Sequence, residues 1–107
     1  MAALAAAGCG GGGAGGGAQT TTQQQPRPTA QERRGRQLFV TKCGPCHALA
    51  AAGTHGSAGP DLDEHPWRAV SVREDIDSGP GLMPAGLVSG ADAGSVAAFV
   101  AAATRRG

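Results

Sequence analysis

Large side chains are scarce in this chain, and their scarcity limits what it can fold into more than any other feature. Its 107 residues include two Phe, one Trp and no Tyr. Much of the glycine lies between Gly8 and Gly17, and Thr, Gln and Pro fill the stretch up to Pro28. Folding therefore falls to one small domain, residues 29–107. A domain of that size with so few aromatic residues usually needs a disulfide, a metal or a cofactor to hold it together.

The balance of charge argues against nucleic acid as a partner. Nine Lys and Arg against eight Asp and Glu give a formal net charge of +1, so no general field attracts nucleic acid or an anionic membrane. The basic side chains nevertheless cluster between Arg27 and Lys42, and acidic ones between Asp61 and Asp77. Two interpretations stay open: two solvated helix faces, or a dipolar protein that orients itself toward a partner.

The first nine residues resemble the end of a bacterial lipoprotein signal. Met1–Gly8 has no Lys or Arg and is far shorter than the ~20 apolar residues that span a membrane. In such signals small residues precede a cysteine that is lipidated, as Ala6-Ala7-Gly8 precede Cys9 here. We interpret residues 1–9 as a signal remnant with Cys9 as the lipid anchor, and residues 10–28 as a flexible linker. The alternative is that Cys9 belongs to a low-complexity leader.

An all-α fold is expected, because no strand alternation of useful length occurs. Good helix formers and late apolar residues predict a first helix from Thr29 or Ala30 to about Thr41. Gly35 lies inside this helix at a cost of ~1 kcal/mol relative to Ala, which a closely packed neighbour would explain. Residues 48–65 and the Gly- and Pro-rich segment Gly79–Pro84 are expected to be loops.

Two further helices follow from helical spacing of apolar residues. The second has Pro66 at its first position and ends at Gly79, and its pattern is carried by Ala69, Val72, Arg73 and Ile76. The third opens at Ser89, which with Asp92 predicts a capping box. It continues through Val96, Phe99, Val100 and Ala103 to Arg105 and Arg106, whose charges complement the helix dipole.

The most informative motif is Cys43-Gly44-Pro45-Cys46-His47. C-x-x-C-H is the attachment pattern for c-type haem. Its spacing lets two thiols reach two vinyl groups on one edge of the porphyrin and holds the adjacent histidine beneath the iron. A neutral imidazole nitrogen is a suitable iron ligand.

The same residue types also serve other chemistries. Cys-Gly-Pro-Cys is also the thioredoxin active-site tetrapeptide, but that fold needs a strand before the motif and a sheet around it. A zinc site could use Cys43, Cys46 and two of His47, His55 and His65, although the usual second pair of ligands is missing. A plain Cys43–Cys46 disulfide leaves His47 unexplained.

Met83 is the best candidate for a second axial ligand. It and the initiator are the two methionines of the chain. A thioether is a soft ligand, and His/Met ligation raises the reduction potential of haem iron. The alternative is an ordinary core methionine, which its place between Leu82 and Pro84 in a Gly- and Pro-rich loop makes less attractive.

Over residues 33 to about 104 the chain resembles the class I cytochromes c, small monohaem electron carriers of bacteria. The matched positions run in order: Gly35 and Phe39 with Phe99, Cys43-x-x-Cys46-His47, Gly59-Pro60-Asp61-Leu62, and Val72–Ile76 with Gly79 and Met83-Pro84. The resemblance implies about three helices around one covalently attached haem c. It also implies that the Pro60 carbonyl accepts the ring N–H of His47 and so orients it. The chain departs from the family in lacking a Tyr in the last helix.

The resemblance implies an electron carrier and not an enzyme, working alone or as a subunit of a larger oxidoreductase. Its iron would cycle between Fe(II) and Fe(III) with His47 and Met83 bound, and its partners would be respiratory redox proteins such as an oxidase, a dehydrogenase or a quinol-oxidising complex. Haem attachment places such a protein outside the cytoplasmic membrane, in the periplasm or tethered through Cys9. The alternatives are a five-coordinate haem sensor or peroxidase-like protein, and a thioredoxin-like dithiol oxidoreductase.

Three further side chains with ring nitrogens follow the motif in the sequence. Trp67 either donates its indole N–H near the haem propionates or simply packs in the core. His55 and His65 lie in predicted loops and are expected to be exposed.

Overall fold

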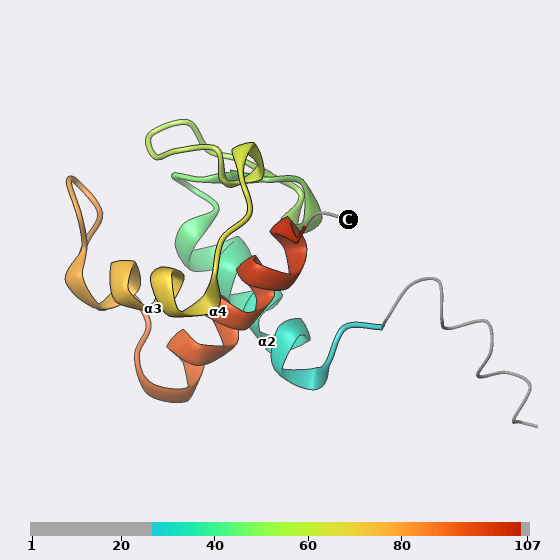
Figure 1. Cartoon of the computed structure of the whole chain (residues 1–107). Helices are drawn as coiled ribbons and strands as arrows, with labels where there is room; N and C mark the ends of the chain where they lie inside the picture. Colours follow the sequence, from blue (N-terminus) through green and yellow to red (C-terminus); the bar gives the residue numbers. More distant parts are fainter. Residues whose placement is uncertain (1–26, 106–107) are drawn as a thin grey trace, which may run out of the picture.

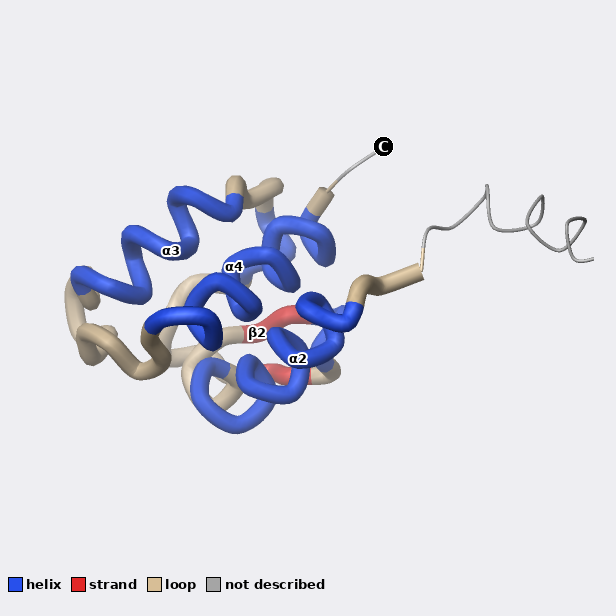
Figure 2. Tube along the Cα trace, turned by 90° about the horizontal axis from the view of Figure 1, so that it is seen from below, coloured by secondary structure: helices blue, strands red, loops and turns tan. Residues whose placement is uncertain are grey.

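The computed structural model describes residues 27–105 and confirms the all-α fold. Its α-helices are α2 (Ala30–Leu38), α3 (Ala69–Ser78) and α4 (Gly90–Thr104). Helix α4 packs against both α2 and α3 and forms the middle of the domain (Figure 1, Figure 2). Within residues 27–105 no helix is long and apolar enough to cross a membrane. The predicted signal remnant with Cys9, the predicted linker as far as residue 26, and Arg106 lie outside the described residues.

Helix α2 begins with a capping box and ends in a wider turn. Thr29 Oγ1 accepts from the Glu32 N–H at 3.0 Å, and the Glu32 carboxylate accepts from the Thr29 N–H at 3.0 Å. After Leu38 the chain continues as the π-helical turn η3 (Phe39–Cys43), in which the N–H of Gly44 donates to Phe39 O at 2.7 Å. The helical segment predicted to about Thr41 is thus present, and its last turn buries Cys43.

Gly35 is the point of closest approach between α2 and α4. A Cβ there would collide with the backbone carbonyl of Ser95 and would lie 2.8 Å from Phe99 Cβ. One turn further on, the rings of Phe39 and Phe99 pack with centroids 5.9 Å apart and a tilt of 59°. The close neighbour expected for Gly35, and the contact of Gly35 and Phe39 with Phe99, are therefore both found.

Helix α3 starts later than the sequence predicted. Its N-cap is Arg68, so Pro66 lies before the helix and not at its first position. Arg68 has an extended backbone (φ -90, ψ 143), which keeps Pro66 and Trp67 out of the helix. The backbone N–H of Trp67 donates to Thr104 Oγ1 at 2.9 Å, which ties the segment before Arg68 to α4. At the other end Gly79 adopts φ 65 and donates its N–H to Asp75 O at 2.8 Å, ending the helix where it was predicted to end.

Helix α4 begins after Ser89, as expected, but without the predicted capping box. The Ser89 side chain makes no capping hydrogen bond. The Asp92 carboxylate instead lies 3.6 Å from Arg34 Nε on α2, and an aspartate is short for the reciprocal bond that a glutamate makes. The helix ends at Thr104, with Arg105 as its C-cap.

The predicted loop 48–65 contains short regular pieces. Two-residue strands β2 (Ala48–Leu49) and β3 (Thr54–His55) pair antiparallel, with 3₁₀ turns η4 (Ala50–Ala52) and η5 (Leu62–Glu64) beside them. Pieces of two or three residues carry too little periodicity to be read from sequence. They leave the fold class unchanged.

Candidate functional site

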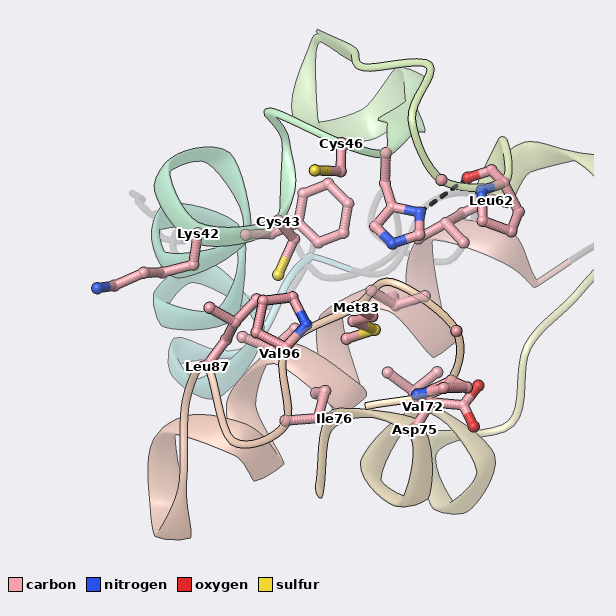
Figure 3. Close-up of a pocket in the computed structure, with 18 of the residues that line it drawn as sticks. Lys42, Cys43, Cys46, Leu62, Val72, Asp75, Ile76, Met83, Leu87 and Val96 are labelled. Atoms are coloured by element: carbon pink, nitrogen blue, oxygen red, sulfur yellow. Dashed lines mark hydrogen bonds between the residues drawn. The ribbon is translucent and has the colours of Figure 1, made fainter. Parts of the chain in front are cut away.

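A cavity of about 460 Å³ opens between α3, α4, the motif segment and the loop that leads into α4 (Figure 3). Most of its lining is apolar, and Leu62, Val72, Ile76, Leu87 and Val96 are among the residues that form it. Lys42 and Asp75 are its charged lining residues. A large apolar cavity with a few polar groups is the usual form of a cofactor site.

Both motif cysteines reach this cavity. Cys43 ends the π-helical turn and is buried, whereas Cys46 is exposed. The N–H groups of Cys46 and His47 both donate to Cys43 O, at 3.1 and 2.9 Å, which folds the motif into a tight turn. Burial, and secondarily the neighbouring Cys46, raises the pKa of the Cys43 thiol to about 11. In this environment Cys43 is a neutral thiol.

His47 is oriented by the segment that returns past it. Its Nδ1 donates to Pro60 O at 2.9 Å, the bond drawn as a dashed line in Figure 3. A Cβ at Gly59 would lie 2.8 Å from His47 Nδ1, so the absence of a side chain lets the backbone pass close to the ring. The N–H of Gly59 donates to Cys46 O at 2.7 Å and fixes this approach. The Pro60 bond leaves Nε2 as the ring nitrogen available to a ligand.

Met83 is half-buried and lines the same cavity from the loop after α3. This loop is not free backbone: the N–H of Met83 donates to Pro80 O at 3.1 Å, and the N–H of Gly86 returns to Ile76 O at 2.7 Å. Gly79 admits the turn because a side chain there would collide with Met83 O and Ala85. The structure therefore brings together the four side chains that the motif and the single internal methionine suggested, with Pro60 beside them.

Trp67 lines the cavity, and its indole Nε1 is a buried atom without a hydrogen-bond partner. His65 packs on this indole with ring centroids 4.4 Å apart and a tilt of 36° between the ring planes. His55 and His65 are both exposed, as expected, and neither lines the cavity.

The zinc interpretation finds no support in residues 27–105, where no three His, Cys, Asp or Glu side chains group as metal ligands do. In the same residues β2 and β3 are too short for a thioredoxin-type sheet.

Three polar side chains that the sequence did not single out support the site. Thr54 Oγ1 donates to His47 O at 2.9 Å and accepts from the Leu49 N–H at 3.1 Å. The carboxylate of Asp63 accepts from the Ala50 N–H at 2.7 Å. Thr104 holds the backbone of Trp67. Nothing in the local sequence marks these residues, because each acts on a segment reached only through the tertiary fold.

Comparison with known proteins finds related cytochromes. A family model described as cytochrome C oxidase, cbb3-type, subunit III, matches residues 30–100. The structure is similar to that of the c-type cytochrome SorU from Sinorhizobium meliloti, with a TM-score of 0.65 and 32% sequence identity over 69% of this chain and 91% of that one. No curated protein sequence gives a significant match.

Proposed function

Because this chain belongs to the cytochrome family of cbb3-type cytochrome c oxidase subunit III, we propose that His47 and Met83 are the axial ligands of its haem iron. The chain is a monohaem class I cytochrome c with one covalently bound haem c, and it is an electron carrier. The observation that carries the ligand proposal is that His47 and Met83 line one cavity from separate segments.

The residues present fit a haem. Two thiols, an imidazole with one ring nitrogen left over, and a thioether all line an apolar cavity. The same wall carries the unpartnered N–H of Trp67. An unpaired buried N–H costs about 1–3 kcal/mol, so a bound group that offers an acceptor there is favoured.

Each residue has a distinct task in this proposal. Cys43 and Cys46 form the two thioether bonds, and His47 Nε2 and the Met83 sulfur bind the iron. Pro60 O keeps the His47 ring in one tautomer and orientation, which makes the ring a better electron donor to a metal. The bound haem supplies a one-electron Fe(II)/Fe(III) couple. The apolar side chains of the cavity exclude water from it, and this favours the less charged reduced form.

Occupation of both axial positions by protein is what makes the site a carrier. With His47 and Met83 in place, no position is left for oxygen, peroxide or a gas, and the ligand set stays the same in both oxidation states. A five-coordinate sensor or peroxidase-like protein is the competing function, and it requires that Met83 does not bind. The two functions therefore differ at one sulfur atom.

Met83→Ala tests the ligand set. Oxidised wild-type protein is expected to show the near-infrared absorption band of methionine sulfur on ferric iron, and the variant is expected to lose it. The reduced variant should bind carbon monoxide rapidly and show a lower reduction potential, because the soft thioether favours Fe(II). Leu82→Ala is the matched control: Leu82 is the neighbouring residue, is 99% exposed and also lines the cavity. It has no atom that can bind iron, so its loss should preserve the band.

A wild-type protein without the band, and with rapid carbon monoxide binding when reduced, would overturn the carrier assignment of these ligands in favour of the five-coordinate alternative. A colourless protein would revive the dithiol oxidoreductase. Absorption spectra of the purified protein, with and without carbon monoxide, test both alternatives.

We also propose that the protein is exported and receives electrons from, or delivers them to, a respiratory oxidase, dehydrogenase or quinol-oxidising complex. Family membership supports redox protein partners, and covalent haem attachment supports a location outside the cytoplasmic membrane. Cys9, which lies outside the described residues, is the proposed lipid anchor. Membrane fractionation of the native protein, followed by mass analysis of its N-terminus, tests this location.

A further inference from the structure

Thr104, the last residue of α4, binds the backbone of Trp67, whose side chain lines the cavity. Its Oγ1 accepts from the backbone N–H of Trp67 at 2.9 Å and donates to Val100 O at 2.8 Å. Thr104 is 2% exposed, so these two bonds are shielded from water. Both roles, acceptor and donor, need a hydroxyl group, and an apolar side chain of the same volume provides neither.

Trp67 is the part of this arrangement that lines the cavity. Nε1 is the one buried side-chain nitrogen or oxygen in residues 27–105 that has no hydrogen-bond partner, and Trp67 lines the cavity. An N–H in this position calls for an acceptor on the group that fills the cavity. The acceptors that a haem offers at its edge are its carboxylates.

We propose that Thr104 is a positioning residue that acts through Trp67 to set the reduction potential of the haem. The proposal rests on the proposed function, since it requires a haem in this cavity. An N–H donated to a carboxylate offsets part of its negative charge, and negative charge near the iron favours Fe(III) over Fe(II). Displacing the indole therefore lowers the reduction potential.

The bond from Trp67 Nε1 also affects the protonation of the haem carboxylate that accepts it. Donation from Nε1 stabilises the charged carboxylate, so losing the bond raises the pKa of that carboxylate and extends the pH dependence of the potential toward neutral pH. The other charged or titratable side chains to consider are Lys42 and Asp75, which line the cavity, and His65, which packs on Trp67. Lys42 and Asp75 are the same in all the variants below. Because Trp67→Phe changes the neighbour of His65, the pH series is repeated with His65→Gln in each background.

The experiment measures reduction potential against pH for the full haem-containing chain. Thr104→Val removes both hydrogen bonds at nearly constant volume and is expected to lower the potential and increase its pH dependence. Thr104→Ser keeps the hydroxyl and should restore wild-type behaviour. Trp67→Phe removes the N–H and should shift the potential in the same direction as Thr104→Val. In the double variant Thr104→Val should add nothing, because both changes break one path.

Ser95→Ala supplies the matched control. Ser95 Oγ donates to Ala91 O at 3.0 Å, the same kind of bond within α4, and Ser95 is 7% exposed. Its carbonyl faces Gly35 on the α2 side. The Ser95→Ala potential should equal that of the wild type at every pH, which separates the Trp67 path from a general loosening of α4.

Two results would overturn the inference. One is an equal shift by Thr104→Val with and without Trp67. The other is an unchanged potential in Trp67→Phe, which decides the matter even if Thr104→Val does not fold. The near-infrared band of the wild type separates this outcome from failure of the proposed function: its absence contradicts Met83 ligation, whereas a normal band with no Trp67→Phe shift contradicts only the role of Thr104.

Discussion

Gly35 and Gly94 are both helical glycines, and replacing each by alanine should change stability in opposite directions. A Cβ at Gly35 would collide with the Ser95 carbonyl, a backbone atom that cannot move aside, whereas at Gly94 the nearest atoms are the ends of Arg73 and Gln31 at 3.7 and 3.8 Å. We expect Gly35→Ala to cost about 3 kcal/mol through overpacking. Gly94→Ala should gain about 0.5–1 kcal/mol from helix propensity.

Thermal unfolding of the two haem-containing variants checks this pair. A lower midpoint for Gly35→Ala with a higher one for Gly94→Ala is expected. Equal midpoints would mean that α2 and α4 can move apart at Gly35 without loss.

At the scale of single residues, a contact could be predicted from the sequence only where a helical pattern or a family motif marks both residues. Gly35 and Phe39 could be predicted to meet Phe99 because they share a helical face and the chain resembles a known family. The Thr104 bond to Trp67 could not, since the two residues are 37 positions apart and a threonine at a helix end carries no distinctive signal. The spacing of residues in the sequence predicts local structure, whereas contacts between distant segments depend on how the helices pack.

At the scale of the element, the N-caps of α2 and α4 differ in whether their side chains make capping hydrogen bonds. Thr29 and Glu32 form the reciprocal capping bonds of α2, while the Ser89 side chain makes none at α4. We expect Thr29→Ala to lower the free energy of unfolding by about 1 kcal/mol and Ser89→Ala to lower it by only a few tenths. Denaturant unfolding of the haem-containing variants measures both, and the reverse order would contradict the hydrogen bonds described here.

Helix positions were predictable, and helix starts were less so. The segment of α2 could be predicted from its good helix formers, and the segments of α3 and α4 from apolar residues at helical spacing. The predicted start of α3 is wrong, because the extended backbone of Arg68 places Pro66 before the helix. The capping box was assigned to Ser89 and Asp92 but is found at Thr29 and Glu32, because Asp92 is engaged with Arg34.

At the scale of the whole molecule, the cavity decides whether the chain folds without haem. Without haem the apolar lining of the cavity of about 460 Å³ lacks a packing partner. A small domain with so few large side chains has little other core to compensate for this loss. The haem-free chain is therefore expected to be largely unfolded, and a cooperatively folded Cys43→Ala/Cys46→Ala variant would contradict this.

Alkylation of the haem-free wild-type chain gives an independent measure, because the fold treats its two motif thiols differently. Folding would raise the pKa of Cys43 from 9.0 to about 11, chiefly by burial, so at pH 8 its thiolate would be about 100-fold scarcer than in an unfolded chain. Exposed Cys46 has no such burial. An unfolded chain should therefore alkylate both thiols at similar rates, read by mass spectrometry of the Cys43 and Cys46 products. Selective protection of Cys43 would show that the protein builds its cavity before the haem arrives.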